Sequence, residues 1–107
     1  MGAPLKITMQ DIRGVVGIIP TPATEDADHW SAAETIELAQ TEKMVNTILD
    51  ANVDVIMTTG TFGECATLTE EELRTFVRAV VHTVGGKCPV FAGITTLNTR
   101  DTISRGR

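Results

Sequence analysis

The sequence predicts an α/β fold that consists of the first three βα units of a (β/α)8 TIM barrel, and three observations lead to this prediction. Three short apolar runs, which start at Gly14, Asp54 and Pro89, alternate with helical patterns. Each run is apolar throughout, as is typical of parallel strands covered on both faces. The starts are 40 and 35 residues apart, which suits one βα unit of a barrel because eight units occupy about 250 residues.

The first unit begins with the run GVVGII at residues 14–19. The sequence Pro20-Thr21-Pro22 follows it, and because proline cannot continue a central strand, we predict a buried strand that ends there. A polar and acidic stretch over residues 23–31 predicts a long loop. From about Thr35 to Asn52 the apolar residues fall mostly on one helical stripe, which predicts a helix that ends near Asn52.

The second unit contains a strand at residues 54–57, a turn and a helix. Gly60 and Gly63 follow the strand, and we expect them to supply the backbone conformations that a sharp turn needs. Thr69 and Glu72 have the spacing of a capping box, so the helix is predicted to start near Thr69. Its apolar residues keep the i, i+3, i+4 rhythm of a helix until a pair of glycines ends it after residue 84.

The third unit begins with the apolar run PVFAGI at residues 89–94. Either Asn98 or Thr99 is expected to cap a helix that begins near Arg100, with the chain stopping inside that helix. Three strands cannot close a barrel, and an isolated three-stranded parallel sheet has two edges open to pairing. We therefore expect residues 1–107 to be an incomplete part of a larger domain.

Composition limits the classes of partner and site. The net charge is −5 and there is no dense Lys/Arg cluster, so we expect no binding to nucleic acid or to an anionic membrane. Cys65 and Cys88 lack CxxC spacing, which disfavours a metal site and a disulfide-rich secreted scaffold and favours the cytoplasm. The first eleven residues have no long apolar core, and no run is long enough to cross a membrane.

Three loops follow the predicted strands, at the end where parallel α/β folds bind ligands. These loops, at residues 20–22, 58–64 and 95–99, are rich in threonine. Backbone N–H groups around Thr61, Phe62 and Gly63 can converge on a small anion such as a carboxylate, with the Thr61 hydroxyl assisting. The commoner alternative is that the glycines only make a tight turn. The loop matches neither a Walker motif nor a complete dinucleotide fingerprint, so no cofactor is expected.

Other reactive side chains have two interpretations each. Cys65 is either a nucleophile or, more commonly for such a residue, a small buried one. Glu64 is either a general base or, more commonly, a carboxylate that accepts backbone hydrogen bonds near a helix start. His29 and Trp30 either line a pocket or anchor the long loop, and the sequence favours neither interpretation.

Several motifs together resemble one known family. The block GTFGECATLTEEE, residues 60–72, is similar to the signature of the pyruvate-dependent class I aldolases that include dihydrodipicolinate synthase and N-acetylneuraminate lyase. Within that signature, Phe62 stands where the family usually has a second threonine. With the sequences PTP at 20–22, DADHW at 26–30 and TTLNTR at 95–100, the chain most resembles the trans-o-hydroxybenzylidenepyruvate hydratase-aldolase branch, over the N-terminal third of the barrel.

The resemblance implies a lyase reaction on a pyruvyl aromatic substrate in the catabolism of polycyclic aromatic compounds. A barrel lysine forms a Schiff base with the substrate ketone, water adds to the conjugated double bond, and retro-aldol cleavage releases an aromatic aldehyde and pyruvate. It implies that Gly60, Thr61, Phe62 and Gly63 bind the substrate, with Thr61 and the Phe62 backbone holding its carboxylate. It also implies that the Thr61 hydroxyl is catalytic, in a proton relay with a tyrosine. The Phe62 ring is expected to suit an aromatic substrate. Such enzymes usually form homotetramers.

Two parts of that machinery are missing from this sequence. The chain has no tyrosine, and its lysines are Lys6, Lys43 and Lys87, none of which is predicted to lie at the catalytic face of a barrel. We therefore expect the chain by itself to be inactive as an aldolase. The alternative is a small non-catalytic α/β module that binds a carboxylate or serves in assembly.

Overall fold

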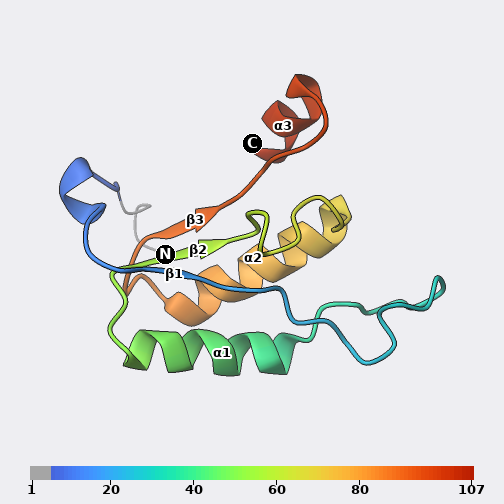
Figure 1. The fold of residues 1–107 in the computed structure, drawn as a ribbon, viewed down its shortest axis with the longest axis horizontal. Coiled ribbons are helices and arrows are strands. Elements are labelled where there is room, and N and C mark those ends of the chain that lie inside the picture. The colour runs from blue at the N-terminus through green and yellow to red at the C-terminus, as the bar shows by residue number, and fades with distance from the viewer. Residues whose placement is uncertain (1–5) are drawn as a thin grey trace.

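The computed structural model describes residues 6–107, and residues 1–5, the first part of the segment assessed above for a targeting signal, lie outside this range. A short 3-10 helix at Met9–Asp11 precedes three strands and three α-helices. In chain order (Figure 1) these are β1 (Val16–Ile18), α1 (Leu38–Asp50), β2 (Val55–Thr58), α2 (Glu70–Val84), β3 (Val90–Ala92) and α3 (Thr99–Arg105).

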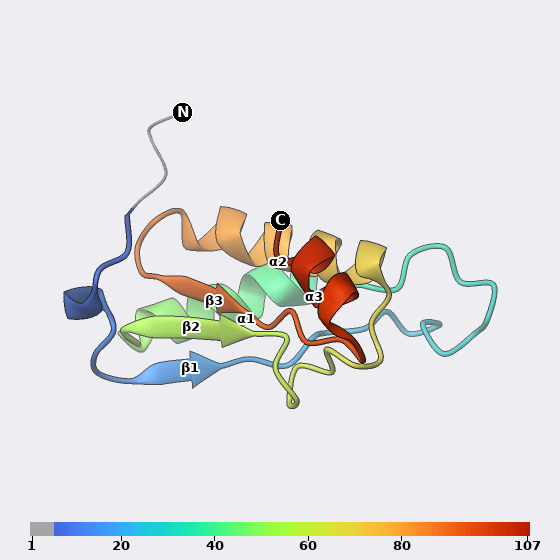
Figure 2. The same cartoon turned by 90° about the horizontal axis from the view of Figure 1, so that it is seen from above.

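The three strands form one parallel sheet in the order β1-β2-β3. Val16 pairs with Val55 in one ladder, and Ile56 pairs with Val90 in the other. Helices α1 and α2 lie side by side along the same face of the sheet, and α3 lies beyond the carboxyl ends of the strands, near the start of α2 (Figures 1 and 2). The predicted fold class, three successive βα units of a barrel, is confirmed.

The hydrophobic core lies between the sheet and the two long helices. Its fully buried side chains include Ile19 from the first unit, Ile56 from β2 and Phe76 from α2. Gly17 lets α1 approach β1 closely, because a Cβ atom there would stand 3.1 Å from Cγ2 of Ile48. Burial of these apolar side chains is the main force that holds the helices on the sheet.

The prediction that the strands are covered on both faces holds for Val55 and Ile56 of β2, which are fully buried, but it is wrong for β1 in the part of the chain described here. Gly17 faces α1, and because side chains alternate along a strand, Val16 and Ile18 face the opposite side. Val16 is 42% exposed and Ile18 is 55% exposed. β2 is mostly buried because it has a strand on each side, whereas β1 and β3 are edge strands among residues 6–107.

The helix boundaries follow local capping chemistry. α1 starts three residues later than predicted, because Glu37 is the N-cap and its carboxylate accepts a hydrogen bond from the Ala39 N–H. Asn52, with φ of 60°, follows the end of α1 as predicted. α2 has the predicted capping box, and Gly85 ends it in the left-handed conformation. No helix within residues 6–107 combines the length and the apolar character needed to span a bilayer.

The third helix also departs from its prediction. Asn98 is the N-cap, and its side chain accepts a hydrogen bond from the Asp101 N–H, so the first of the two predicted caps is confirmed. The helix does not continue to the last residue, because it ends at Arg105 with Gly106 as its C-cap.

Glu72 joins the first two units in addition to capping α2. One carboxylate oxygen accepts a hydrogen bond from the Thr69 N–H at 2.8 Å, and the other accepts one from the Thr35 hydroxyl at 2.6 Å. These hydrogen bonds, first that of Thr35 and then that of the Thr69 backbone, lower the pKa of Glu72 below its ordinary value. The ionised form of Glu72 therefore stabilises the folded chain.

We predict that Glu72→Gln lowers the free energy of unfolding at pH 7 and that this loss shrinks as the pH falls. The pKa of Glu72 is lower in the folded state, so its stabilisation is present above the unfolded-state pKa and disappears as the pH drops through the folded-state pKa. Urea denaturation at pH 7, 5 and 3 measures the difference. Glu71→Gln is the control, because the Glu71 carboxylate makes no hydrogen bond with residues 6–107. An equal loss at all three pH values would contradict the prediction.

Candidate functional site

The three threonine-rich loops meet at the carboxyl edge of the sheet, as the sequence predicts. The Thr21 hydroxyl, after β1, donates a hydrogen bond to the Gly63 carbonyl at 2.8 Å. The Thr59 hydroxyl, after β2, donates to the Gly93 carbonyl at 2.9 Å. These two bonds connect the ends of all three strands, so the loop between β2 and α2 is held from both sides.

The expectation that Gly60 and Gly63 supply the unusual backbone angles of this loop is wrong. The positive φ angles belong to Thr59, at 47°, and to Glu64, at 63°. Gly63 is required for a different reason, because a Cβ atom there would lie 2.6 Å from the Thr59 backbone nitrogen. At Gly60 an added Cβ would meet nothing within 4 Å. Positive φ is uncommon outside glycine and costs about 1–3 kcal/mol, so the tethers must hold this loop in place.

The loop leaves several polar groups without a hydrogen-bond partner among residues 6–107. Thr61 is exposed, and within residues 6–107 its hydroxyl has no hydrogen-bond partner. The N–H groups of Thr61, Phe62 and Gly63 also have none in this range, although the Glu64 N–H bonds back to the Thr61 carbonyl at 3.1 Å. Three free N–H groups and a hydroxyl on a short turn can bind a carboxylate. The Phe62 ring, part of a residue that is 62% exposed, lies beside them.

A cavity of about 850 Å³ opens next to this loop. Gly60 and Thr61 line it from the loop after β2, whereas Phe62 and Gly63 do not. Its other walls come from the rest of the loop after β2, the start of α2, the loop after β3, and α3; they comprise Glu64, Cys65, Ala66, Thr67, Glu70, Arg74, Thr95, Thr96, Leu97, Asn98, Asp101, Ser104 and Arg105. Of the four predicted site residues, two therefore line the cavity and two do not.

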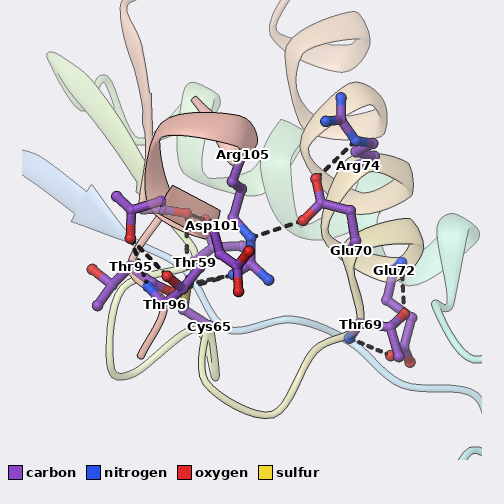
Figure 3. A network of polar contacts seen from close by, with 12 residues as sticks. Thr59, Cys65, Thr69, Glu70, Glu72, Arg74, Thr95, Thr96, Asp101 and Arg105 are labelled. Atoms are coloured by element: carbon purple, nitrogen blue, oxygen red, sulfur yellow. Dashed lines mark hydrogen bonds and ion pairs between the residues drawn. The ribbon is translucent and has the colours of Figure 1, made fainter. Parts of the chain in front are cut away.

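Arg105 makes a contact network that sequence reasoning missed (Figure 3). Its Nε atom lies 2.9 Å from Oε2 of Glu70, and its Nη1 atom donates to the Thr95 carbonyl at 3.2 Å. Glu70 also pairs with Arg74 four residues later. The i, i+4 spacing signals the second pair, but no local pattern signals a pair 35 residues apart. The Arg105 network links α3 to α2 and to the loop after β3.

For Cys65 the structure supports the commoner interpretation. The thiol is buried, and it donates to the Thr95 carbonyl at 3.3 Å beneath Arg105 rather than contacting either histidine. Glu64 lines the cavity, and its carboxylate accepts no hydrogen bond from residues 6–107, so the interpretation of a backbone acceptor is wrong for Glu64.

The other thiol, that of Cys88, lies outside the lining of this cavity. Burial raises the pKa of the Cys88 thiol, which favours its neutral form.

The pair His29 and Trp30 lies apart from this cavity. Their rings are stacked with centroids 6.0 Å apart, and the Ser31 hydroxyl lies 2.8 Å from Nδ1 of His29. They line a second cavity of about 610 Å³ between the loop after β1 and the start of α2. Trp30 is 93% exposed and does not anchor the loop, whereas the His29 ring is hydrogen-bonded to Ser31 within it.

Lys43 and Lys87 lie away from the carboxyl edge of the sheet, and the described residues form no group of metal ligands. Lys43 lies on α1, and Lys87 lies in the turn before β3, at the amino edge of the sheet. Among residues 6–107 no three His, Cys, Asp or Glu side chains are grouped so that they could hold a metal ion. The carboxyl edge therefore offers hydroxyl and N–H donors, but none of these lysines.

Comparison with known proteins decides the family. The model of the dihydrodipicolinate synthetase family matches residues 13–107. This range includes the three strands, the three α-helices and the loop at residues 60–63. The chain belongs to this family. The resemblance found in the sequence is thereby confirmed.

Curated relatives place the chain closer to one branch. It is 50% identical over 99 residues to trans-2'-carboxybenzalpyruvate hydratase-aldolase of Nocardioides sp. (strain KP7), covering 92% of this chain and 30% of that protein. It is 46% identical over 102 residues to trans-O-hydroxybenzylidenepyruvate hydratase-aldolase of Pseudomonas putida, covering 95% and 31%. The chain thus spans about a third of the length of these enzymes.

Solved structures agree with the fold. The structure "PhdJ bound to substrate intermediate" superposes with a TM-score of 0.89 at 56% identity, covering 95% of this chain and 32% of that one. A dihydrodipicolinate synthase from Bacillus anthracis gives a TM-score of 0.74 at 33% identity, over 86% of this chain and 30% of that one. The three βα units therefore have the arrangement found in complete members of the family.

We predict that Gly63→Ala lowers the free energy of unfolding by about 2 kcal/mol or more, whereas Gly60→Ala changes it by less than about 1 kcal/mol. The added methyl at Gly63 would collide with the Thr59 backbone, and at Gly60 it would enter open space. Urea denaturation of the two variants measures the difference. Equal losses of stability would show that the contact between Gly63 and Thr59 does not constrain this loop.

Proposed function

We propose that this chain is the N-terminal part of a single TIM-barrel domain of a pyruvate-dependent hydratase-aldolase. The complete enzyme would cleave a benzylidenepyruvate-type substrate to an aromatic aldehyde and pyruvate, through a Schiff base, in the catabolism of polycyclic aromatic compounds. The observation that carries this proposal is the free donor set of Thr61 and its neighbours at the carboxyl edge, in a chain 50% identical to a hydratase-aldolase.

In this proposal the loop at residues 60–63 binds the pyruvyl carboxylate. The N–H groups of Thr61, Phe62 and Gly63 are free within the described range, and donors held in place before the substrate arrives bind an anion without reorganisation. The Thr61 hydroxyl, also free, would hold the carboxylate and pass a proton to or from the substrate. Gly60 would leave space for the substrate, because nothing within 4 Å faces it.

Phe62 would contribute to substrate preference. Phe62 is 62% exposed in this loop, so its ring can pack against an aromatic group on the substrate. A threonine at this position would keep the backbone N–H but would lose the apolar surface. Phe62 thus retains the donor for the carboxylate and adds a contact for the ring.

The Schiff-base lysine and the relay tyrosine would come from outside this chain. There is no tyrosine in the sequence, and Lys43 and Lys87 lie away from the carboxyl edge. A protonated imine accepts the electron pair released when the C–C bond breaks, so cleavage requires that lysine. We therefore propose that the chain by itself has no aldolase activity.

The exposed face and edges of the sheet support a larger domain. Val16 and Ile18 present apolar side chains on the face without helices, and β1 and β3 each have one unpaired edge among residues 6–107. Further βα units would cover both. Association of complete barrels into a homotetramer and a cytoplasmic location are also part of the proposal.

A chimera tests the proposal directly. Residues 13–107 of this chain replace the matched segment of the Nocardioides hydratase-aldolase, to which the chain is 50% identical, and aldehyde release from trans-2'-carboxybenzalpyruvate is measured. We expect an active chimera that borohydride and pyruvate label on a lysine outside the replaced segment, and no labelling of this chain alone. A folded but inactive chimera, together with pyruvate binding by this chain alone, would favour the non-catalytic carboxylate-binding module.

We predict that Thr61→Val in the chimera lowers kcat/KM by about 100-fold, because it removes a hydroxyl that moves a proton in the reaction. Thr61→Ser, which keeps the hydroxyl, should retain most of the activity. Steady-state kinetics on both variants measures the effect. Equal activity of the valine and serine variants would exclude a catalytic role for the hydroxyl.

We predict that Phe62→Thr in the chimera raises KM for the aromatic substrate about tenfold, because the substrate ring loses an apolar contact. A tenfold change corresponds to about 1.4 kcal/mol of binding. Inhibition by pyruvate serves as the internal control, and its inhibition constant should stay within about twofold because pyruvate has no ring to contact Phe62. Unchanged KM for the aromatic substrate would show that Phe62 does not contact the ring.

A further inference from the structure

We propose that Thr21 is a positioning residue for the pyruvyl carboxylate, acting through the backbone of the loop at residues 60–63. This inference rests on the function proposed above. Thr21 is a buried residue in the loop after β1, and its hydroxyl donates a hydrogen bond to the Gly63 carbonyl at 2.8 Å across 42 positions of sequence. Because that hydroxyl is buried and engaged, it orients the loop without touching the substrate.

The hydrogen bond of Thr21 completes the restraint of one peptide group. The carbonyl of the peptide between Gly63 and Glu64 accepts from Thr21 at 2.8 Å, and the N–H of the same peptide donates to the Thr61 carbonyl at 3.1 Å. With both ends held, this peptide plane cannot rotate. It closes the turn that carries the free N–H groups of Thr61, Phe62 and Gly63.

The restraint matters because the loop has an unfavourable backbone. Glu64 follows the held peptide with φ of 63°, and Thr59 precedes the turn with φ of 47°. Residues in such conformations persist only where their surroundings hold them. Thr59 is held on the β3 side by its bond to the Gly93 carbonyl, and Thr21 supplies the restraint on the β1 side.

Loss of the Thr21 hydroxyl would act on anion binding through this carbonyl. The Gly63 residue is buried, and a buried carbonyl without a partner is unfavourable. Rotation of the peptide toward a new partner would turn a C=O dipole into the donor set and would misplace the neighbouring N–H groups. A carboxylate is repelled by a carbonyl oxygen, so its binding would weaken while the chemistry at the imine is less affected.

Thr41 provides a matched control for this test. It is also a buried threonine, and its hydroxyl donates to the Glu37 carbonyl at 2.8 Å. It lies on α1, away from the carboxylate loop. Thr41→Val therefore removes a buried threonine hydroxyl and a hydrogen bond of the same length without altering the loop, although this bond is local to α1 and the Glu37 carbonyl keeps its bond from the Thr41 N–H. It separates the general effect of losing a buried hydroxyl from a loss of positioning.

The test uses the chimera described above, so that a complete barrel carries residues 13–107. Thr21→Val, Thr21→Ser and Thr41→Val are compared by steady-state kinetics and thermal unfolding. We expect Thr21→Val to raise KM for the pyruvyl substrate and the inhibition constant of pyruvate about tenfold, with kcat changed less than about threefold. Thr21→Ser should restore both constants, and Thr41→Val should lower the melting temperature without changing either constant.

The outcomes separate this inference from the function on which it rests. An active parent chimera whose KM and pyruvate inhibition are unchanged by Thr21→Val would overturn the positioning role alone. Equal increases of KM in Thr21→Val and Thr41→Val would also overturn it, because the effect would then be one of stability. A folded parent chimera without activity would overturn the proposed function and this inference with it.

Discussion

Parallel pairing of β2 with a strand on each side is the constraint on which the rest of this structure depends. It places the carboxyl ends of all three strands at one edge, so that loops far apart in sequence become neighbours. Thr21 then reaches Gly63, and Thr59 reaches Gly93. Without that pairing, the loop at residues 60–63 would have no tethers to hold its unfavourable backbone.

The threonines at this edge divide into two kinds. Thr21 and Thr59 are buried, and each donates to a backbone carbonyl, so they build the loop. Thr61 is exposed and within residues 6–107 its hydroxyl is free, so it can meet a ligand. A site for a small carboxylate needs both kinds, because free donors bind an anion well only when the backbone that carries them is already in place.

The two faces of the sheet have different surroundings. α1 and α2 bury one face around Ile56 and Phe76, while Val16 and Ile18 remain largely exposed on the other. In a complete barrel that second face would line the interior, where inward side chains pack in layers. The proposed enzyme therefore depends on further βα units both for the Schiff-base lysine and for burial of this apolar surface.

The sequence by itself determined the βα order, the parallel sheet, the capping box of Thr69 and Glu72, and the carboxyl-edge location of the loop at 60–63, because periodicity, caps and glycines act over a few residues. The signature in residues 60–72 also predicted the family. Only the tertiary structure decided that Thr59 and Glu64 carry the positive φ angles, and that Arg105 pairs with Glu70. It also decided which threonine hydroxyls are free, because these features depend on contacts between residues far apart in the chain, which no local pattern encodes.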